Sequence, residues 1–240
     1  KPSLDVIAES SDLTAVPVAA LLRFAVLATK SSAIAERGLG PVAAAAAESL
    51  AEWPFDDVAK LLLAVAKTKG ASASAGGQRL FARAAEVVQP KLPEISAPQL
   101  IKTALAVNGV DTCRPLLASV AKEAIARLSD LKPPQLLLLT RGLLPLGAKE
   151  GNVAKILDFW ARLLTPEEDS NDVLGEASIS KRRVELESRA ALPADQLAQL
   201  MQLLVPVVDP AHPVLEAIGA RLLDVVGNLS DSGKAALSAL

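Results

Sequence analysis

At 240 residues and a formal net charge of −2, the chain is long enough for one large domain with a substantial core. Hydrophobic residues make up 51% of it and aromatic residues only 2%. Because alanine and leucine favour helices whereas aromatic residues favour strands, this composition predicts an all-α protein packed through small side chains. A single cysteine argues against a disulfide-bonded secreted scaffold, and no run approaches the roughly 18 apolar residues of a membrane span. We therefore expect no membrane span.

A pattern of two apolar helices bounded by proline or a polar cap returns along the chain. One apolar position marks successive copies at spacings of 40, 42, 36 and 61 residues: Val18, Val58, Leu100, Leu136 and Leu197. Such a period predicts an α-solenoid of about five helical-hairpin repeats, 36–42 residues each, with one insert. We expect one domain over residues 1–240, with repeats at about 13–54, 55–96, 97–132, 133–164 and 193–228.

The first copy is the least regular, as terminal repeats often are because they have a neighbour on one side only. Its first helix carries one apolar stripe, made of Val18, Leu21, Leu22 and Ala25. We expect Pro41 to open its partner helix, which is mostly alanine.

The second copy is the most regular. Asp56 or Asp57 is expected to cap its first helix, where a carboxylate can accept free backbone N–H groups. One helix face then follows at positions i, i+3, i+4 and i+7: Val58, Leu61, Leu62 and Val65. The small-residue stretch from Gly70 to Gly77 is predicted to be a loop, and Pro90 to end the partner helix, because proline cannot continue one.

Proline and glycine mark the helix boundaries of the later copies. The third copy begins with Ser96 as a cap and Pro98 in the first turn, and Pro115 opens its partner helix. The fourth copy turns at Gly147, and the second helix of the fifth begins near Pro213.

An insert at residues 165–192 separates the fourth copy from the fifth and holds an acidic run followed by a basic one. Insertions in solenoids map to loops and often to contacts. We interpret this one as a partner-binding arm, with a solvated excursion of the chain as the alternative. Its candidate contact residues are Lys181, Arg182 and Arg183. Residues 229–240 look like the start of a further helix, and the sequence is compatible with native extensions beyond Lys1 and Leu240.

A short motif recurs at the start of the first helices: Pro98-Gln99-Leu100, Pro134-Gln135-Leu136 and the near version Asp195-Gln196-Leu197. Partner helices end in a hydrophobic residue and proline, as in Leu92-Pro93. Over about residues 13–228 the chain resembles the octotricopeptide and heptatricopeptide repeat families, which are similar to the repeats that precede RAP domains. The resemblance implies an array of helical hairpins of roughly 37–40 residues. It also implies binding of organelle RNA or a place in a mitochondrial ribosome.

The residues offer little for catalysis, which needs a convergent set of groups with tuned pKa values. The chain has one histidine, one cysteine and no tyrosine. We expect His212 to cap a helix or to contact a partner, and Cys113 to be a small residue at a helix-connecting turn. Neither a nucleophile elbow nor a phosphate-binding Gly-Lys-Ser/Thr loop occurs. We therefore expect a non-enzyme without cofactor or metal.

Charge is distributed unevenly along the chain. Residues 1–54 carry a net charge of −2, residues 55–165 carry +6 (15 basic, 9 acidic) and residues 166–240 carry −6. Because contacts to an RNA backbone need Lys and Arg on a common surface, the basic middle supplies candidate RNA or phosphate contacts. These are Lys60, Lys67, Lys69, Arg79, Arg83, Lys102 and Arg141. Scattered solvated charge is the alternative, and the aromatic residues that could stack on bases fall mostly at core positions.

The sequence thus predicts a non-catalytic scaffold in a large organelle assembly, with a mitochondrial ribosome as the first expectation. Protein subunits would be its main partners, and a few basic residues would contact rRNA. Two alternatives stay open: a freestanding organelle RNA-binding or maturation factor, and a protein-only accessory subunit of a respiratory, ATP-synthase or photosynthetic complex. Basic side chains gathered in one concave groove would favour RNA, whereas dispersed ones would favour protein contacts.

Overall fold

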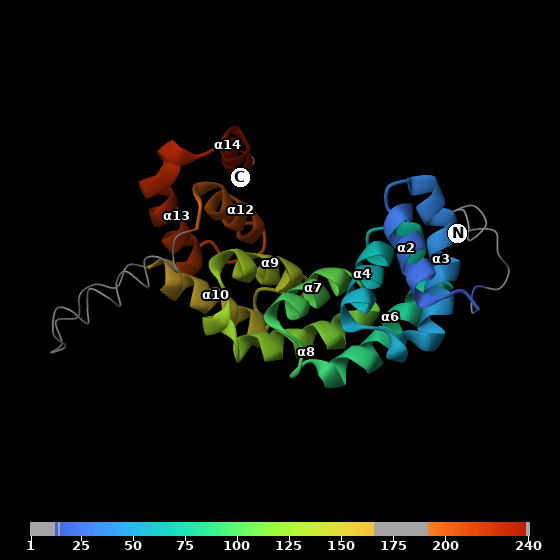
Figure 1. The fold of residues 1–240 in the computed structure, drawn as a ribbon. Helices are drawn as coiled ribbons and strands as arrows, with labels where there is room; N and C mark the ends of the chain where they lie inside the picture. Colours follow the sequence, from blue (N-terminus) through green and yellow to red (C-terminus); the bar gives the residue numbers. More distant parts are fainter. Residues whose placement is uncertain (1–12, 14, 166–191, 239–240) are drawn as a thin grey trace. The chain divides into compact units, whose positions relative to one another are not determined.

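The structure, a computed structural model, describes residues 13, 15–165 and 192–238. Within these residues the chain forms α-helices joined by short turns, several of them 3-10 helical, and has no strand (Figure 1). The all-α class expected from the composition is confirmed. The chain divides into two compact units, residues 1–124 and 125–240, and each is described by itself. The single domain expected over the whole chain stays a prediction.

The first unit contains the first three predicted helix pairs. We call the first helix of each pair an A helix and the second a B helix. Its A helices are α2 (Val18–Ala28), α4 (Phe55–Ala66) and α7 (Ala97–Val107), and its B helices are α3 (Ser32–Ser49), α6 (Ala75–Val88) and α8 (Arg114–Ile125). Helix α2 packs against α4, α4 packs against α7 beside it in Figure 1, and α3 packs against α6. The A helices of this unit therefore stack in chain order, and the B helix α3 stacks on the B helix α6.

The second unit repeats this order. Its A helices are α9 (Pro133–Leu143), α12 (Ala194–Leu204) and α14 (Asp231–Ser238), and its B helices are α10 (Gly151–Leu164) and α13 (Pro213–Val225). Helix α12 packs against both α9 and α14, and α10 packs against α13. The start of a further helix expected at residues 229–240 is present as α14.

The apolar stripes read from the sequence form the core of each unit. In α4 the four stripe positions, Val58, Leu61, Leu62 and Val65, are at most 2% exposed. A stripe at this spacing covers one side of the helix, so it is buried when the helix meets its partner and the neighbouring pair. The helix boundaries also follow the prolines: α6 ends before Pro90, and α13 begins at Pro213.

One predicted boundary is wrong. Pro41 does not open the second helix of the first pair; α3 begins at Ser32 and continues through Pro41. Proline lacks the N–H that this position would donate to the carbonyl of Arg37. Leu39 and Val42 beside it are fully buried, and this packing holds the helix together across the missing hydrogen bond.

The stretch from Gly70 to Gly77 is not the loop that its composition suggests. It holds most of the short helix α5 (Lys69–Ala73), then Ser74, then the first turn of α6. The Oγ of Ser74 accepts a hydrogen bond from the N–H of Gly77 at 3.0 Å and so caps α6. A side-chain cap makes up for the weak helix propensity of two adjacent glycines.

Small residues let the helices of the first unit approach closely. A Cβ added at Gly76 in α6 would collide with the carbonyl oxygen of Gly40 in α3 and would lie 3.0 Å from the Cβ of Ala44. In the same way, the ring of Phe24 in α2 occupies the space that a side chain at Gly38 would need. The stacking of α2, α3 and α6 therefore depends on glycine and alanine at these contacts.

The second unit carries a hydrogen bond inside its core. Thr140 in α9 donates to the carbonyl of Leu136 at 2.8 Å and accepts from the indole N–H of Trp160 in α10 at 2.9 Å. Trp160 is fully buried, so the hydroxyl of Thr140 gives its N–H the partner that water cannot. Thr103 in α7 is equally buried but only donates, to the carbonyl of Gln99 at 2.9 Å.

Replacing Gly76 by alanine should destabilise the first unit by about 1–3 kcal/mol, because the new methyl group has no room against α3. The matched control is Gly219→Ala in α13, where an added Cβ meets nothing within 4 Å. That change should be neutral or should stabilise by about 0.5–1 kcal/mol through helix propensity. Urea unfolding of both variants measures the difference, and equal effects would contradict the close approach of α3 and α6.

Replacing Thr140 by valine should cost about 1–3 kcal/mol, because it leaves the buried N–H of Trp160 without an acceptor. Thr103→Val should cost less, because the carbonyl of Gln99 keeps its place in the helix and no donor is orphaned. Thermal and urea denaturation, each followed by circular dichroism, compare the two variants. A larger loss in Thr103→Val would refute this account.

Candidate functional site

Two of the predicted basic residues lie on A helices and pair with carboxylates. Lys60 is 2.9 Å from Asp57 within α4, and Lys102 of α7 is 3.1 Å from Asp56 of α4. The hydrogen bond and the charge of Asp57 raise the pKa of Lys60 above its ordinary value. The expectation that Asp56 or Asp57 caps α4 is wrong, because the N-cap position is Pro54. Both acids lie in the first turn instead, where they still interact favourably with the helix dipole.

Two further predicted residues lie on the B helix α6 and are also paired. Arg79 reaches Glu48 of α3 at 3.1 Å, and Arg83 bonds Glu86 one turn further along α6 at 2.6 Å. These pairs are largely exposed to solvent, so they contribute little to stability. The carboxylates of Glu48 and Glu86 nevertheless offset the positive charge of Arg79 and Arg83.

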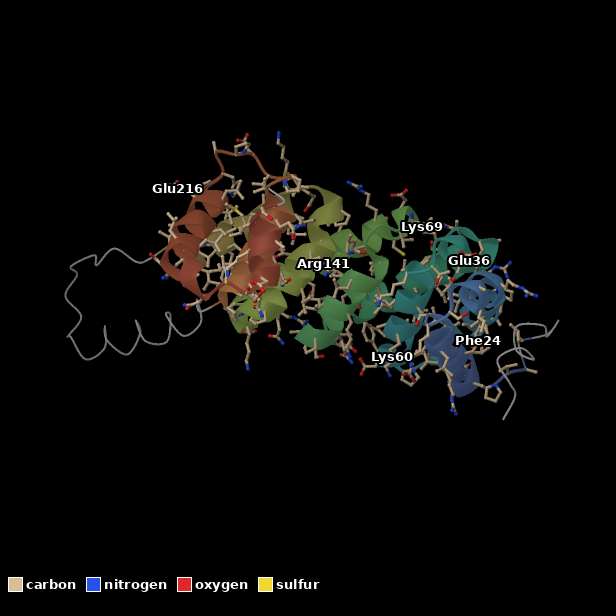
Figure 2. All side chains as sticks on the ribbon, turned by 90° about the horizontal axis from the view of Figure 1, so that it is seen from above. Phe24, Glu36, Lys60, Lys69, Arg141 and Glu216 are labelled. Carbon is tan, nitrogen blue, oxygen red and sulfur yellow. The ribbon has the colours of Figure 1, made fainter. Side chains whose placement is uncertain are left out.

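Three predicted residues have no ion pair among the residues that the structure describes: Lys67, Lys69 and Arg141. Lys67 is the C-cap of α4, Lys69 begins α5, and Arg141 lies in the last turn of α9 in the second unit. Cations near a helix C-terminus are favoured by the helix dipole, which accounts for Lys67 and Arg141 without a ligand. In Figure 2, Lys60 and Lys69 lie toward opposite edges of the first unit.

The predicted RNA-contact residues of the first unit therefore do not lie on one kind of helix. Those of the first unit are divided between A and B helices, and four of them are neutralised by carboxylates 2.6–3.1 Å away. The three basic residues proposed for the insert, Lys181, Arg182 and Arg183, lie outside the described residues.

The aromatic residues are mostly core residues, as expected. Phe24, Phe81, Trp53 and Trp160 are at most 3% exposed, and Phe55 and Phe159 are half-buried. The indole N–H of Trp53 donates to Ser49 at 3.1 Å, as that of Trp160 does to Thr140. Within the described part of the chain, these four rings are unavailable as stacking platforms for single-stranded RNA.

The two residues whose side chains could take part in catalysis or metal binding, Cys113 and His212, have structural roles. Cys113 is fully buried in the turn before α8, and its Sγ lies 3.5 Å from the carbonyl oxygen of Phe81. Burial raises the pKa of its thiol to about 11. The Nδ1 of His212 accepts from the N–H of Val214 at 3.2 Å, which confirms the expected cap of α13. In the described ranges, no three His, Cys, Asp or Glu side chains come together where they could hold a metal ion.

The glutamine of the recurring motif has a local role that the sequence alone did not reveal. It is the third residue of its helix, and its side-chain oxygen accepts from the N–H of the N-cap residue. Gln99 bonds Ser96 and Gln135 bonds Lys132, each at 3.0 Å. In α12 the N-cap is Pro193, which has no N–H, and the buried oxygen of Gln196 has no partner within the described residues. The motif thus serves to cap the N-terminus of a helix.

Comparison with known proteins found no matching family model, no matching curated protein and no matching solved structure. Among the helices of the described residues, none combines the length and the hydropathy needed to cross a bilayer.

The buried thiol of Cys113 should react with Ellman's reagent more slowly in the folded protein than in the unfolded chain. At pH 8 we expect the rate to be lower by about 100-fold or more. As a control, Cys113→Ala combined with Thr112→Cys moves the thiol to an exposed neighbouring position and should react at once. Because the unfolded thiol ionises near pH 9 and the folded one near 11, stability should also fall over that interval. Fast reaction of native Cys113 would contradict its burial.

Proposed function

We propose that this chain is a non-catalytic α-solenoid that works as a structural subunit and holds protein neighbours against its helix faces. The observation that carries the proposal is the order of stacking: A helices pack on A helices within each unit, and B helices pack on B helices where α3 meets α6 and α10 meets α13. Helical-repeat folds are built this way, since each pair contacts only its neighbours and presents an extended surface. The five helix pairs at 18–49, 55–88, 97–125, 133–164 and 194–225 support this interpretation.

The distribution of charge favours protein partners over RNA. A groove that follows a phosphate chain needs several free cations on one surface and usually adds aromatic platforms. Here four of the seven candidate cations have carboxylate partners, and four of the six aromatic side chains are buried. Lys67 and Lys69 are the specific feature in favour of the alternative, an RNA-binding factor, because both are exposed and unpaired among the described residues.

The setting of the scaffold, an organelle assembly such as a mitochondrial ribosome, rests on the resemblance of the repeat to the octotricopeptide and heptatricopeptide families alone. The recurring glutamine explains part of that resemblance as helix capping, so the motif by itself is weak support for a family. We retain the organelle assembly as the setting in which the scaffold should first be sought.

Affinity purification of the full chain from its native source tests the proposal. Defined protein neighbours should remain bound at physiological salt after RNase treatment. Single-stranded RNA should bind weakly in anisotropy titrations, and its affinity should fall steeply between 50 and about 200 mM salt. Lys67→Gln with Lys69→Gln should lower the residual binding, whereas Lys102→Gln, which removes a paired cation, should change it less.

RNA binding that persists at physiological salt, together with loss of all protein neighbours after RNase treatment, would overturn the scaffold in favour of the RNA-binding factor. Protein neighbours that resist RNase but fractionate with a respiratory or photosynthetic complex would retain the scaffold and replace the ribosome as its setting.

A further inference from the structure

The A helices of the first unit, α2, α4 and α7, each expose one narrow side. In α4, for example, Lys60 is exposed and Leu63 is half-buried, whereas the residues around them, Ala59, Leu61 and Leu62, are buried. Residues three and four positions apart share one side of a helix, so the open positions of each A helix form a single stripe. The rest of each helix is buried against its neighbours.

Equivalent positions on the three stripes carry the same kind of side chain. A cation lies near the middle of each helix: Arg23 in α2, Lys60 in α4 and Lys102 in α7. An aliphatic residue follows three positions later: Val26, Leu63 and Leu105. In α2 and α4 a second cation follows seven positions after the first: Lys30 and Lys67. The stripes therefore repeat one pattern, an aliphatic residue with a cation on one side or on both.

Contacts between the A helices bring these stripes onto one surface. Helix α4 lies between α2 and α7 and packs against both (Figure 1). An ion pair joins two of the stripes directly, since the Nζ of Lys102 lies 3.1 Å from the Oδ1 of Asp56, one turn before Lys60. Successive A helices run in the same direction, because a B helix returns the chain between them. We call this surface the A face: the exposed sides of α2, α4 and α7, with the aliphatic row of Val26, Leu63 and Leu105 at its centre.

The A face carries an excess of positive charge. The three helices hold two carboxylates, and both are already paired, Asp57 with Lys60 at 2.9 Å and Asp56 with Lys102. Five cations and two carboxylates leave a net charge of +3 on this face. Three of the cations have no ion pair among the described residues: Arg23, Lys30 and Lys67. The aliphatic row thus has free cations on both of its sides.

The spacing of the two cation rows matches the width of an α-helix. Lys30 and Lys67 lie seven residues beyond Arg23 and Lys60, which corresponds to about 10 Å along the helix axis. An α-helix with its side chains is about 10–12 Å across, so a helix laid over the aliphatic row would have cations along each flank. Packed helices lie about 8–10 Å apart, which is close to two turns of such a helix. One apolar residue in every seven would therefore meet each A helix.

We infer that the A face binds an amphipathic α-helix of a partner protein whose apolar ridge is flanked on both sides by glutamate or aspartate. The ridge would cover Val26, Leu63 and Leu105, and the carboxylates would bond the free cations. Single-stranded RNA fits this face less well, because aliphatic side chains offer its bases no stacking platform. The inference rests on the proposed scaffold function and adds the face and the chemistry of one partner.

A labelled helical peptide of about 22 residues, or six turns, tests the inference by fluorescence anisotropy on the full chain. It carries leucine at i, i+4, i+7, i+11, i+14 and i+18 and glutamate along both flanks of this ridge. Val26→Ser should weaken binding about tenfold, because Val26 begins the aliphatic row. The matched control is Leu138→Ser on the A helix α9 of the second unit, which removes a side chain that is likewise 43% exposed. This control should change binding less than about twofold.

Charge exchange tests the flanking carboxylates. Lys30→Glu combined with Lys67→Glu should weaken binding of the glutamate peptide at least about tenfold. The same variant should bind a peptide that has lysine in place of glutamate along one flank only. Arg79→Glu combined with Arg83→Glu changes the net charge equally but lies on the B helix α6, so it should leave both affinities within about twofold at physiological salt. Circular dichroism of each variant shows that the fold is retained.

Several outcomes would overturn the inference. They are failure of the glutamate peptide to bind, equal losses in Val26→Ser and Leu138→Ser, and equal losses in the two charge variants. Oligouridylate that binds at physiological salt more tightly than the peptide, and is lost in Lys30→Glu with Lys67→Glu, would make RNA the occupant. Self-association that Val26→Ser abolishes would make a second copy the occupant. None of these results bears on whether protein neighbours survive RNase treatment, so the A face and the scaffold function fail separately.

Discussion

The close approach of α3 and α6 is the constraint on which the rest of the first unit depends. Gly40 and Ala44 on one helix meet Gly76 on the other with no room for a further carbon atom. Interiors are packed as densely as organic crystals, so a single added methyl group at such a contact has to displace backbone. This contact joins two successive pairs, and the A helices α2 and α4 of the same pairs also pack against each other.

Stacking of this kind leaves most charged residues at the surface, where they do not contribute to the core. In the first unit they pair with one another along and between neighbouring helices, as Lys102 does with Asp56 and Arg79 with Glu48. A net charge counted along a sequence segment therefore overstates the positive potential of a surface, because the compensating carboxylates lie within hydrogen-bonding distance. The second unit differs, since its helices α9 and α12 carry one charged residue each, Arg141 and Asp195.

The recurring glutamine shows how a motif can arise from local chemistry. A helix start leaves N–H groups without partners, and a glutamine at the third position returns to bond the N-cap residue. Ser96 and Lys132 both supply that N–H, although their side chains differ completely. Pro193 cannot supply it, and the oxygen of Gln196 is left unpaired among the described residues. Any stack of helices that begin in this way could carry the same motif, whatever its ancestry.

The apolar periodicity of the sequence determined most of the local secondary structure. The stripe at Val58, Leu61, Leu62 and Val65 predicts a helix and its buried side, because leucine and valine at that spacing can leave water only on one face. Prolines at 90 and 213 mark helix ends for the same local reason. Where composition alone was used, at Pro41 and from Gly70 to Gly77, it misled, because packing against α2 and α6 and a cap from Ser74 override weak helix propensity.

Only the tertiary structure decided which charges neutralise one another and which faces stay open. Lys102 and Asp56 are 46 residues apart, and Trp160 and Thr140 are 20 apart; nothing in the sequence pairs them before the helices stack. Four of the seven predicted cations are consequently paired with carboxylates, Lys60 and Lys102 on A helices and Arg79 and Arg83 on the B helix α6. Spacing along the chain determines which side of a helix is apolar, but the neighbour that covers it is chosen by contacts between distant segments.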